Sequence, residues 1–119
     1  MRYELTDLAD KDIEDILSDT AKMFGPRQLA TYAKIIDHGI AMIADDPFRG
    51  GSIDCRAIRP DVRLFHLELS AKRRGGAAHC LYYKTGRLSD GIDGVLILRV
   101  LHEHMHPRLK IIRSLNDRD

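Results

Sequence analysis

Side chains suited to acid–base and phosphate chemistry are concentrated in the second half of the chain. Arg63 and Arg99 supply positive charge, and His102 and Tyr83 are groups that transfer protons. Cleavage of an RNA phosphodiester needs a base for the 2′-hydroxyl, cations for the charged transition state and an acid for the leaving oxygen. These residues are candidate catalytic groups, although they do not define a complete acid–base pair.

Arg99 also has a structural interpretation. It lies within an apolar run, where a guanidinium must reach solvent, pair with an acid or face a cleft. Glu68 or Asp61 would be suitable acidic partners. His102, at the end of the same run, is equally compatible with a hydrogen-bonded structural role. We therefore favour a structural or target-contacting role for Arg99 over a catalytic one.

Three histidines alternate at positions 102, 104 and 106. On an extended strand, His102, His104 and His106 would share a face and could converge on zinc. Met105 and Pro107 indicate, however, that the strand has already ended, and no thiolate lies nearby to complete a site. The chain also lacks phosphate-binding loops, a nucleophile elbow and the zinc-protease motif. We expect neither a metal nor another cofactor.

A basic, glycine-tipped segment precedes the last two predicted strands. Lys72, Arg73 and Arg74 are followed directly by Gly75 and Gly76, a composition typical of a hairpin loop. Such a loop is either a solvated tip or a mobile element that contacts a target. We name its three cations as candidate target-binding residues.

Charge is distributed unequally along the chain. Residues 1–55 carry 6 basic and 11 acidic side chains, whereas residues 56–119 carry 13 basic and 7 acidic ones. A basic half can serve a nucleic acid or an acidic protein, or it can neutralise the acidic half within the fold.

Cysteine content and hydropathy favour a cytoplasmic location. Cys55 and Cys80 are too few for a secreted disulfide framework, and we expect both to be reduced thiols. No stretch approaches the roughly 20 apolar residues that span a bilayer, and residues 1–6 do not resemble a signal peptide.

The first half of the chain predicts a strand and two helices. Residues 2–6 alternate, and Thr6 or Asp7 can cap a following helix. Gly25 and Pro26 end that helix and begin the next, which stops at residues 45–47. The short connection predicts an antiparallel helical hairpin. Apolar residues recur at helical spacing in both helices: Ala9, Ile13, Ile16, Leu17, Thr20 and Phe24, then Leu29, Tyr32, Ala33, Ile36, Ile40 and Ile43.

The second half predicts three strands and a short terminal helix. Strands are expected at residues 62–69, 77–84 and 95–102, with residues 70–76 as a hairpin loop. The most apolar run, 95–102, is expected to be the central strand, and the first strand an edge strand. Helices collected on one face of an antiparallel sheet give a two-layer α+β fold, and residues 1–119 form one domain.

Four phrases in this order resemble the ParE branch of the ParE/RelE toxin superfamily. The run 97–105, Ile-Leu-Arg-Val-Leu-His-Glu-His-Met, is similar to the closing strand of these toxins. Residues 5–13 are similar to the opening of their first helix, Asp46-Pro47 to the end of the second, and residues 58–63 to the entry of a strand. The loop 72–76 is longer and more basic than usual, and His106-Pro107 replaces a position that is often acidic.

The resemblance implies the toxin of a type II toxin–antitoxin module, with a RelE/ParE-like fold. A ParD-like antitoxin would neutralise it, and its tail would lie over the helical hairpin and the sheet edge. DNA gyrase is the implied target, with target-binding residues at positions 72–74 and at Arg99 and His102. The alternative is ribosome-dependent mRNA cleavage of the RelE type by Arg63, Arg99 and His102. A third reading is a degenerate toxin that retains only antitoxin binding.

Overall fold

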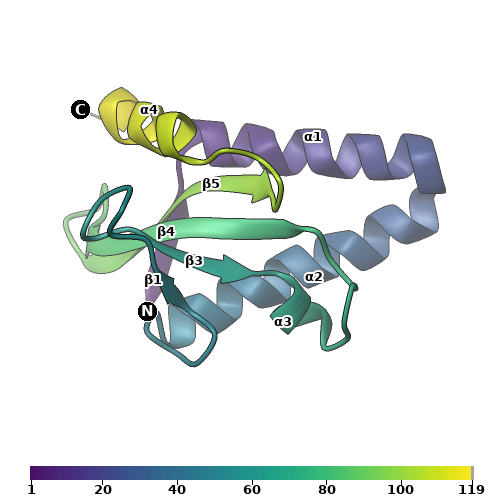
Figure 1. The fold of residues 1–119 in the computed structure, drawn as a ribbon, viewed down its shortest axis with the longest axis horizontal. Helices are drawn as coiled ribbons and strands as arrows, with labels where there is room; N and C mark the ends of the chain where they lie inside the picture. Colours follow the sequence, from purple (N-terminus) through teal and green to yellow (C-terminus); the bar gives the residue numbers. More distant parts are fainter. Residues whose placement is uncertain (119) are drawn as a thin grey trace.

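The computed structural model describes residues 1–118, which form four helices and a five-stranded sheet (Figure 1). The elements in chain order are β1 (Arg2–Leu5), α1 (Asp7–Phe24), α2 (Pro26–Asp45), β2 (Ile53–Asp54), β3 (Arg63–His66), α3 (Glu68–Ala71), β4 (His79–Arg87), β5 (Asp93–His102) and α4 (Arg108–Arg118).

The sheet has the spatial order β1-β5-β4-β3-β2. All neighbouring strands are antiparallel except β1 and β5, which run parallel. The predicted α+β class and the edge position of the first strand are confirmed. The prediction that 95–102 is the central strand is wrong, because β4 occupies the middle and β5 lies between β4 and β1.

Local sequence signals explain the helical hairpin. The Thr6 hydroxyl accepts a hydrogen bond from the Ala9 amide at 3.0 Å and donates one to the Leu98 carbonyl at 2.8 Å, so it caps α1 and ties it to β5. Gly25 joins the helices at φ 89°, a conformation that favours glycine, and Pro26 begins α2. The hairpin crosses one face of the sheet, and its tip projects beyond the strands (Figure 1).

Apolar side chains form a core on each face of the sheet. The inner core joins the helical hairpin to β3, β4 and β5; its fully buried members include Ile36, Ile43, Phe65, Leu81, Tyr83 and Ile97. The outer core lies under α4 and includes Val62, Tyr82, Leu98, Leu101, Ile111 and Leu115. The predicted terminal helix therefore exists and partly covers the second face of the sheet.

Three local predictions differ from the structure. β3 ends at His66 and α3 follows, where a strand to residue 69 and a loop were expected. The two-residue strand β2 was not predicted. Phe24, which belongs to the apolar spacing of the first helix, is 65% exposed. Among residues 1–118, none of the helices is both long and apolar enough to span a membrane.

Candidate functional site

A groove of about 1090 Å³ opens between the tip of the helical hairpin and the segment that links α3 to β4. Its walls come from α1, α2 and residues 70–79, and His102 of β5 also lines it. Most of its lining surface is apolar. The residues that line it are Ile16, Asp19, Thr20, Met23, Phe24, Gln28, Thr31, Tyr32, Lys34, Ile35, His38, Ser70, Ala71, Arg73, Gly75, Gly76, Ala77, Ala78, His79 and His102.

Two features of the chain create this groove. The projecting hairpin tip leaves Met23 and Phe24 without a covering element, so they are 73% and 65% exposed. On the other side, the basic loop turns back on itself: Gly75 has φ 72°, and its amide donates to the Glu68 carboxylate at 2.7 Å. The loop is thereby held as one wall of the groove.

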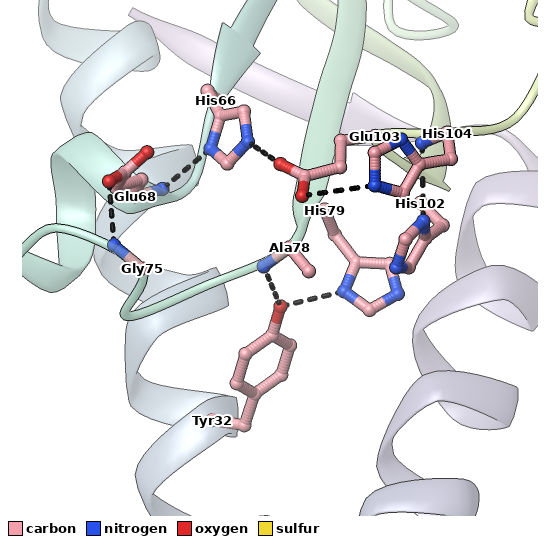
Figure 2. Close-up of polar contacts among 9 residues, drawn as sticks. All are labelled: Tyr32, His66, Glu68, Gly75, Ala78, His79, His102, Glu103 and His104. Atoms are coloured by element: carbon pink, nitrogen blue, oxygen red, sulfur yellow. Dashed lines mark hydrogen bonds and ion pairs between the residues drawn. The ribbon is translucent and has the colours of Figure 1, made fainter.

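A hydrogen-bonded pair, Tyr32 and His79, connects α2 to β4 on the groove floor (Figure 2). The Ala78 amide donates to the Tyr32 hydroxyl at 3.2 Å, and this hydroxyl lies 2.6 Å from Nδ1 of His79. Since the hydroxyl oxygen already accepts from Ala78, we assign the hydroxyl as the donor to Nδ1. Burial, and secondly the charge of His102, lower the pKa of His79 to about 4, so the ring is neutral at pH 7. Burial raises the pKa of Tyr32.

Further histidines surround this pair. His102 contacts His79 edge-to-face, with ring centroids 5.4 Å apart, and its Nδ1 accepts the His104 amide at 3.2 Å. His66 bonds to the Glu103 carboxylate at 2.6 Å (Figure 2). This hydrogen bond lowers the pKa of Glu103.

Arg99 is paired with an acid from the first helix. Its Nε and Nη2 donate to the two Asp12 carboxylate oxygens at 2.6 and 2.7 Å, and the Val100 amide donates to the same carboxylate at 3.0 Å. The expected partners were wrong: Glu68 accepts from Gly75, and the Asp61 carboxylate faces Arg59 and Lys84. The Asp12 contact, led by its hydrogen bonds, raises the pKa of Arg99.

Arg63, on β3, contacts the loop that follows α2. Its Nε donates to the Ser52 hydroxyl at 2.7 Å, and its guanidinium lies 5.1 Å from the centre of the Phe48 ring. Tyr83 is fully buried and donates to the Pro47 carbonyl, and burial raises its pKa. Both residues thus fasten the loop that follows α2.

The candidate catalytic residues do not share one cleft. In the strand register, Arg63 of β3 lies opposite Tyr83 of β4, and His102 of β5 lies opposite His79 of β4. His79 precedes Tyr83 by four residues on β4. Four residues of strand span about 13 Å. Of the predicted site residues, only His102 and Arg73 line the groove; Lys72 and Arg74 are exposed outside its lining.

Tyr32 and His79 are groove residues that sequence reasoning did not select. Both fitted the core pattern of their elements, and only the pairing of His79 with His102 in neighbouring strands brings the imidazoles together. That pairing register carries no local sequence signal.

The three alternating histidines do not form one face. β5 ends at His102, and His104 and His106 lie in the following turn and coil. In the part of the chain that the structure describes, no three His, Cys, Asp or Glu side chains are placed to hold a metal ion. Cys55 and Cys80 are free thiols.

Comparison with known proteins assigns this arrangement to a family. Residues 3–107 match the family model described as ParE toxin of type II toxin-antitoxin system, parDE. The chain is also 30% identical over 106 residues to Toxin ParE1 of Caulobacter vibrioides, a match that covers 89% of this chain and 93% of that protein. The chain therefore belongs to the ParE toxin family of type II toxin–antitoxin systems.

Proposed function

We propose that this protein inhibits DNA gyrase and is neutralised by a ParD-like antitoxin. The observation that carries the proposal is the family match across residues 3–107, which spans the helical hairpin and the strands of the sheet. Inhibition would act through binding, without a chemical step.

The geometry favours a binding protein over an enzyme. The Arg99 guanidinium is neutralised by Asp12, and the Arg63 guanidinium is held by Ser52 and Phe48. Neither cation is presented to the groove that contains His102. A ribonuclease of the RelE type would need cations beside its proton-transfer groups, and this arrangement gives that alternative less support.

The groove suits the antitoxin tail. Its mostly apolar lining and the exposed Met23 and Phe24 would accept the apolar face of an amphipathic segment, and Lys34 and Arg73 would face its acidic residues. This leaves the basic loop residues Lys72 and Arg74, outside the groove lining, as contacts for the target.

The test is a gyrase supercoiling and DNA cleavage assay with the purified, antitoxin-free protein. We expect loss of supercoiling with trapped cleaved DNA, and restoration of supercoiling by the cognate antitoxin. Normal supercoiling at saturating concentration of folded protein would refute gyrase inhibition. Codon-linked mRNA cuts in a translation extract would then establish the ribonuclease alternative, and harmless overexpression would indicate a degenerate toxin.

A triple variant tests the basic loop. Changing Lys72, Arg73 and Arg74 to Ala should weaken gyrase inhibition at least tenfold without unfolding the protein, because all three side chains are exposed. The matched control changes Arg56, Arg59 and Arg87 to Ala, which removes the same charge from exposed positions elsewhere. An equal loss in both variants would indicate a general charge effect instead of a contact surface.

A further inference from the structure

Two imidazoles on the groove floor are each fixed at one nitrogen. Nδ1 of His102 accepts the His104 amide at 3.2 Å, and an amide can only donate. Nδ1 of His79 lies 2.6 Å from the Tyr32 hydroxyl, whose oxygen already accepts from the Ala78 amide, and we assign the hydroxyl as the donor to this ring nitrogen. In each neutral ring the proton must therefore reside on Nε2.

The two Nε2–H groups have no acceptor among the residues that the structure describes. Figure 2 shows these nitrogens of His79 and His102 on neighbouring sides of the two rings, whose centroids are 5.4 Å apart. Both residues line the groove. No buried side-chain nitrogen or oxygen of the described residues lacks a hydrogen-bond partner, so these two donors are open to solvent in the groove. An oxygen ligand that enters the groove can therefore accept from both.

The carboxylates that act on His79 are occupied elsewhere. The charges of Glu103 and Asp12 raise the pKa of His79, whereas those of His102 and His66 lower it. Glu103 accepts from His66 at 2.6 Å, and Asp12 accepts from Arg99 and the Val100 amide. No described carboxylate of this chain fills the position.

We propose that His79 and His102 form a two-donor site that binds a carboxylate of the antitoxin segment docked in the groove. The inference rests on the proposed antitoxin docking. A carboxylate has two oxygens that can accept from both rings. A metal does not suit the site, because metal binding needs an unprotonated ring nitrogen and both Nδ1 atoms are already used.

The groove favours a peptide carboxylate over nucleic-acid phosphates. Its lining is mostly apolar, and it contains the Asp19 carboxylate as well as Lys34 and Arg73. A chain of phosphates would meet this acid and few cations, whereas one carboxylate on an amphipathic segment needs only the two donors and a nearby cation.

Histidine-selective ¹⁵N NMR on the full chain tests the site directly. The neutral form of each ring should be the Nε2–H tautomer, and sodium acetate at pH 7.5 should shift their Nε2 signals in a saturable manner. His38 and His106 should respond as they do to sodium chloride at the same ionic strength. An Nδ1–H tautomer in either ring, or no saturable response, would overturn the proposal. A response to inorganic phosphate but not acetate would overturn the carboxylate assignment.

Two variants complete the test. His102→Leu removes one donor and should weaken acetate binding at His79 at least fivefold. His106→Leu is the matched control, because His106 is exposed and lies outside the groove lining, and it should leave acetate binding unchanged. Equal effects of the two variants would overturn the two-donor site.

The partner is tested with the cognate antitoxin, by calorimetry. His102→Leu should reduce antitoxin affinity about tenfold and His106→Leu should not. Unchanged affinity in His102→Leu would overturn the antitoxin as the source of the carboxylate. The acetate measurements use neither antitoxin nor gyrase, so the site and the proposed function can fail separately.

Discussion

Asp12 satisfies donors from β5 at two neighbouring residues, the Arg99 guanidinium and the Val100 amide. The Asp12 and Arg99 side chains are only 13% and 12% exposed, so removing the acid leaves an arginine and an amide buried without their acceptor. We expect Asp12→Ala to lower the free energy of unfolding by about 3 kcal/mol, measured by urea denaturation.

Lys11→Ala is the control for this variant. The Lys11–Asp15 ion pair lies on the exposed face of the same helix, and its loss should cost at most about 0.5 kcal/mol. Similar destabilisation by both variants would contradict a special role for the Asp12–Arg99 pair.

His79 makes stability depend on pH. Its pKa of about 4 in the folded protein lies below the ordinary value of 6.5, so the unfolded chain takes up the proton first as the pH falls. The neutral ring therefore contributes its full stability above about pH 6.5, and this contribution declines towards pH 4. Denaturation curves at pH 7.5 and pH 5 should show a smaller decline for His79→Gln than for the wild type.

The control for the pH effect is His106→Gln, at an exposed position. It should retain the wild-type pH dependence. If both variants declined like the wild type, another group would be responsible for the loss of stability in acid.

Residue types revealed the candidate groups, but their partners depended on the fold. Arg99 was recognisable as an arginine that needed a partner, because it lies in an apolar strand. Its actual partner, Asp12, is 87 positions away, on a helix whose N-terminal half carries several other acids. Long-range polar pairs of this kind are set by how the helix packs on the sheet, which local periodicity does not encode.

At the level of elements, the exposed tip of the helical hairpin is the clearest candidate for partner binding. Met23 and Phe24 are 73% and 65% exposed at the groove edge. Burial of such side chains contributes about 1.5–3 kcal/mol each. Changing both to Ser should therefore weaken antitoxin binding at least 100-fold, with little change in melting temperature.

Phe48→Ser is the matched control, because Phe48 is 63% exposed but does not line the groove. Its affinity for the antitoxin should stay within about twofold of the wild type. An unchanged affinity of the double variant would place the antitoxin elsewhere on the toxin.

Elements bounded by strong local sequence signals were predicted correctly, whereas the end of β3, which lacks such a signal, was not. The cap at Thr6, the Gly25–Pro26 junction and the stop after Asp45 predicted the helical hairpin closely. The end of β3 was missed, because it depends on His66, whose Nδ1 accepts the Glu68 amide and whose Nε2 bonds to Glu103. Glu103 lies 37 residues away, so the alternation of residues 62–69 gave no sign of this contact.

At the scale of the whole molecule, the two faces of the sheet differ in their roles: one borders the groove and the other is covered by the terminal helix. The inner face carries the helical hairpin and borders the groove, whereas α4 covers the outer face. The family match ends at residue 107, immediately before α4 begins at Arg108. This division suggests that α4 contributes to stability and leaves the groove unaffected.

A double variant on α4 tests whether this helix affects stability without affecting antitoxin binding. Ile111 is fully buried and Leu115 is 7% exposed, both within the outer core. Changing both to Ala removes apolar contacts and leaves a cavity, so unfolding free energy should fall by about 4 kcal/mol. Antitoxin affinity, measured at a temperature where the variant is folded, should remain within about twofold of the wild type, because the groove lies on the inner face. A large loss of affinity in the folded variant would instead show that α4 is part of the antitoxin-binding surface.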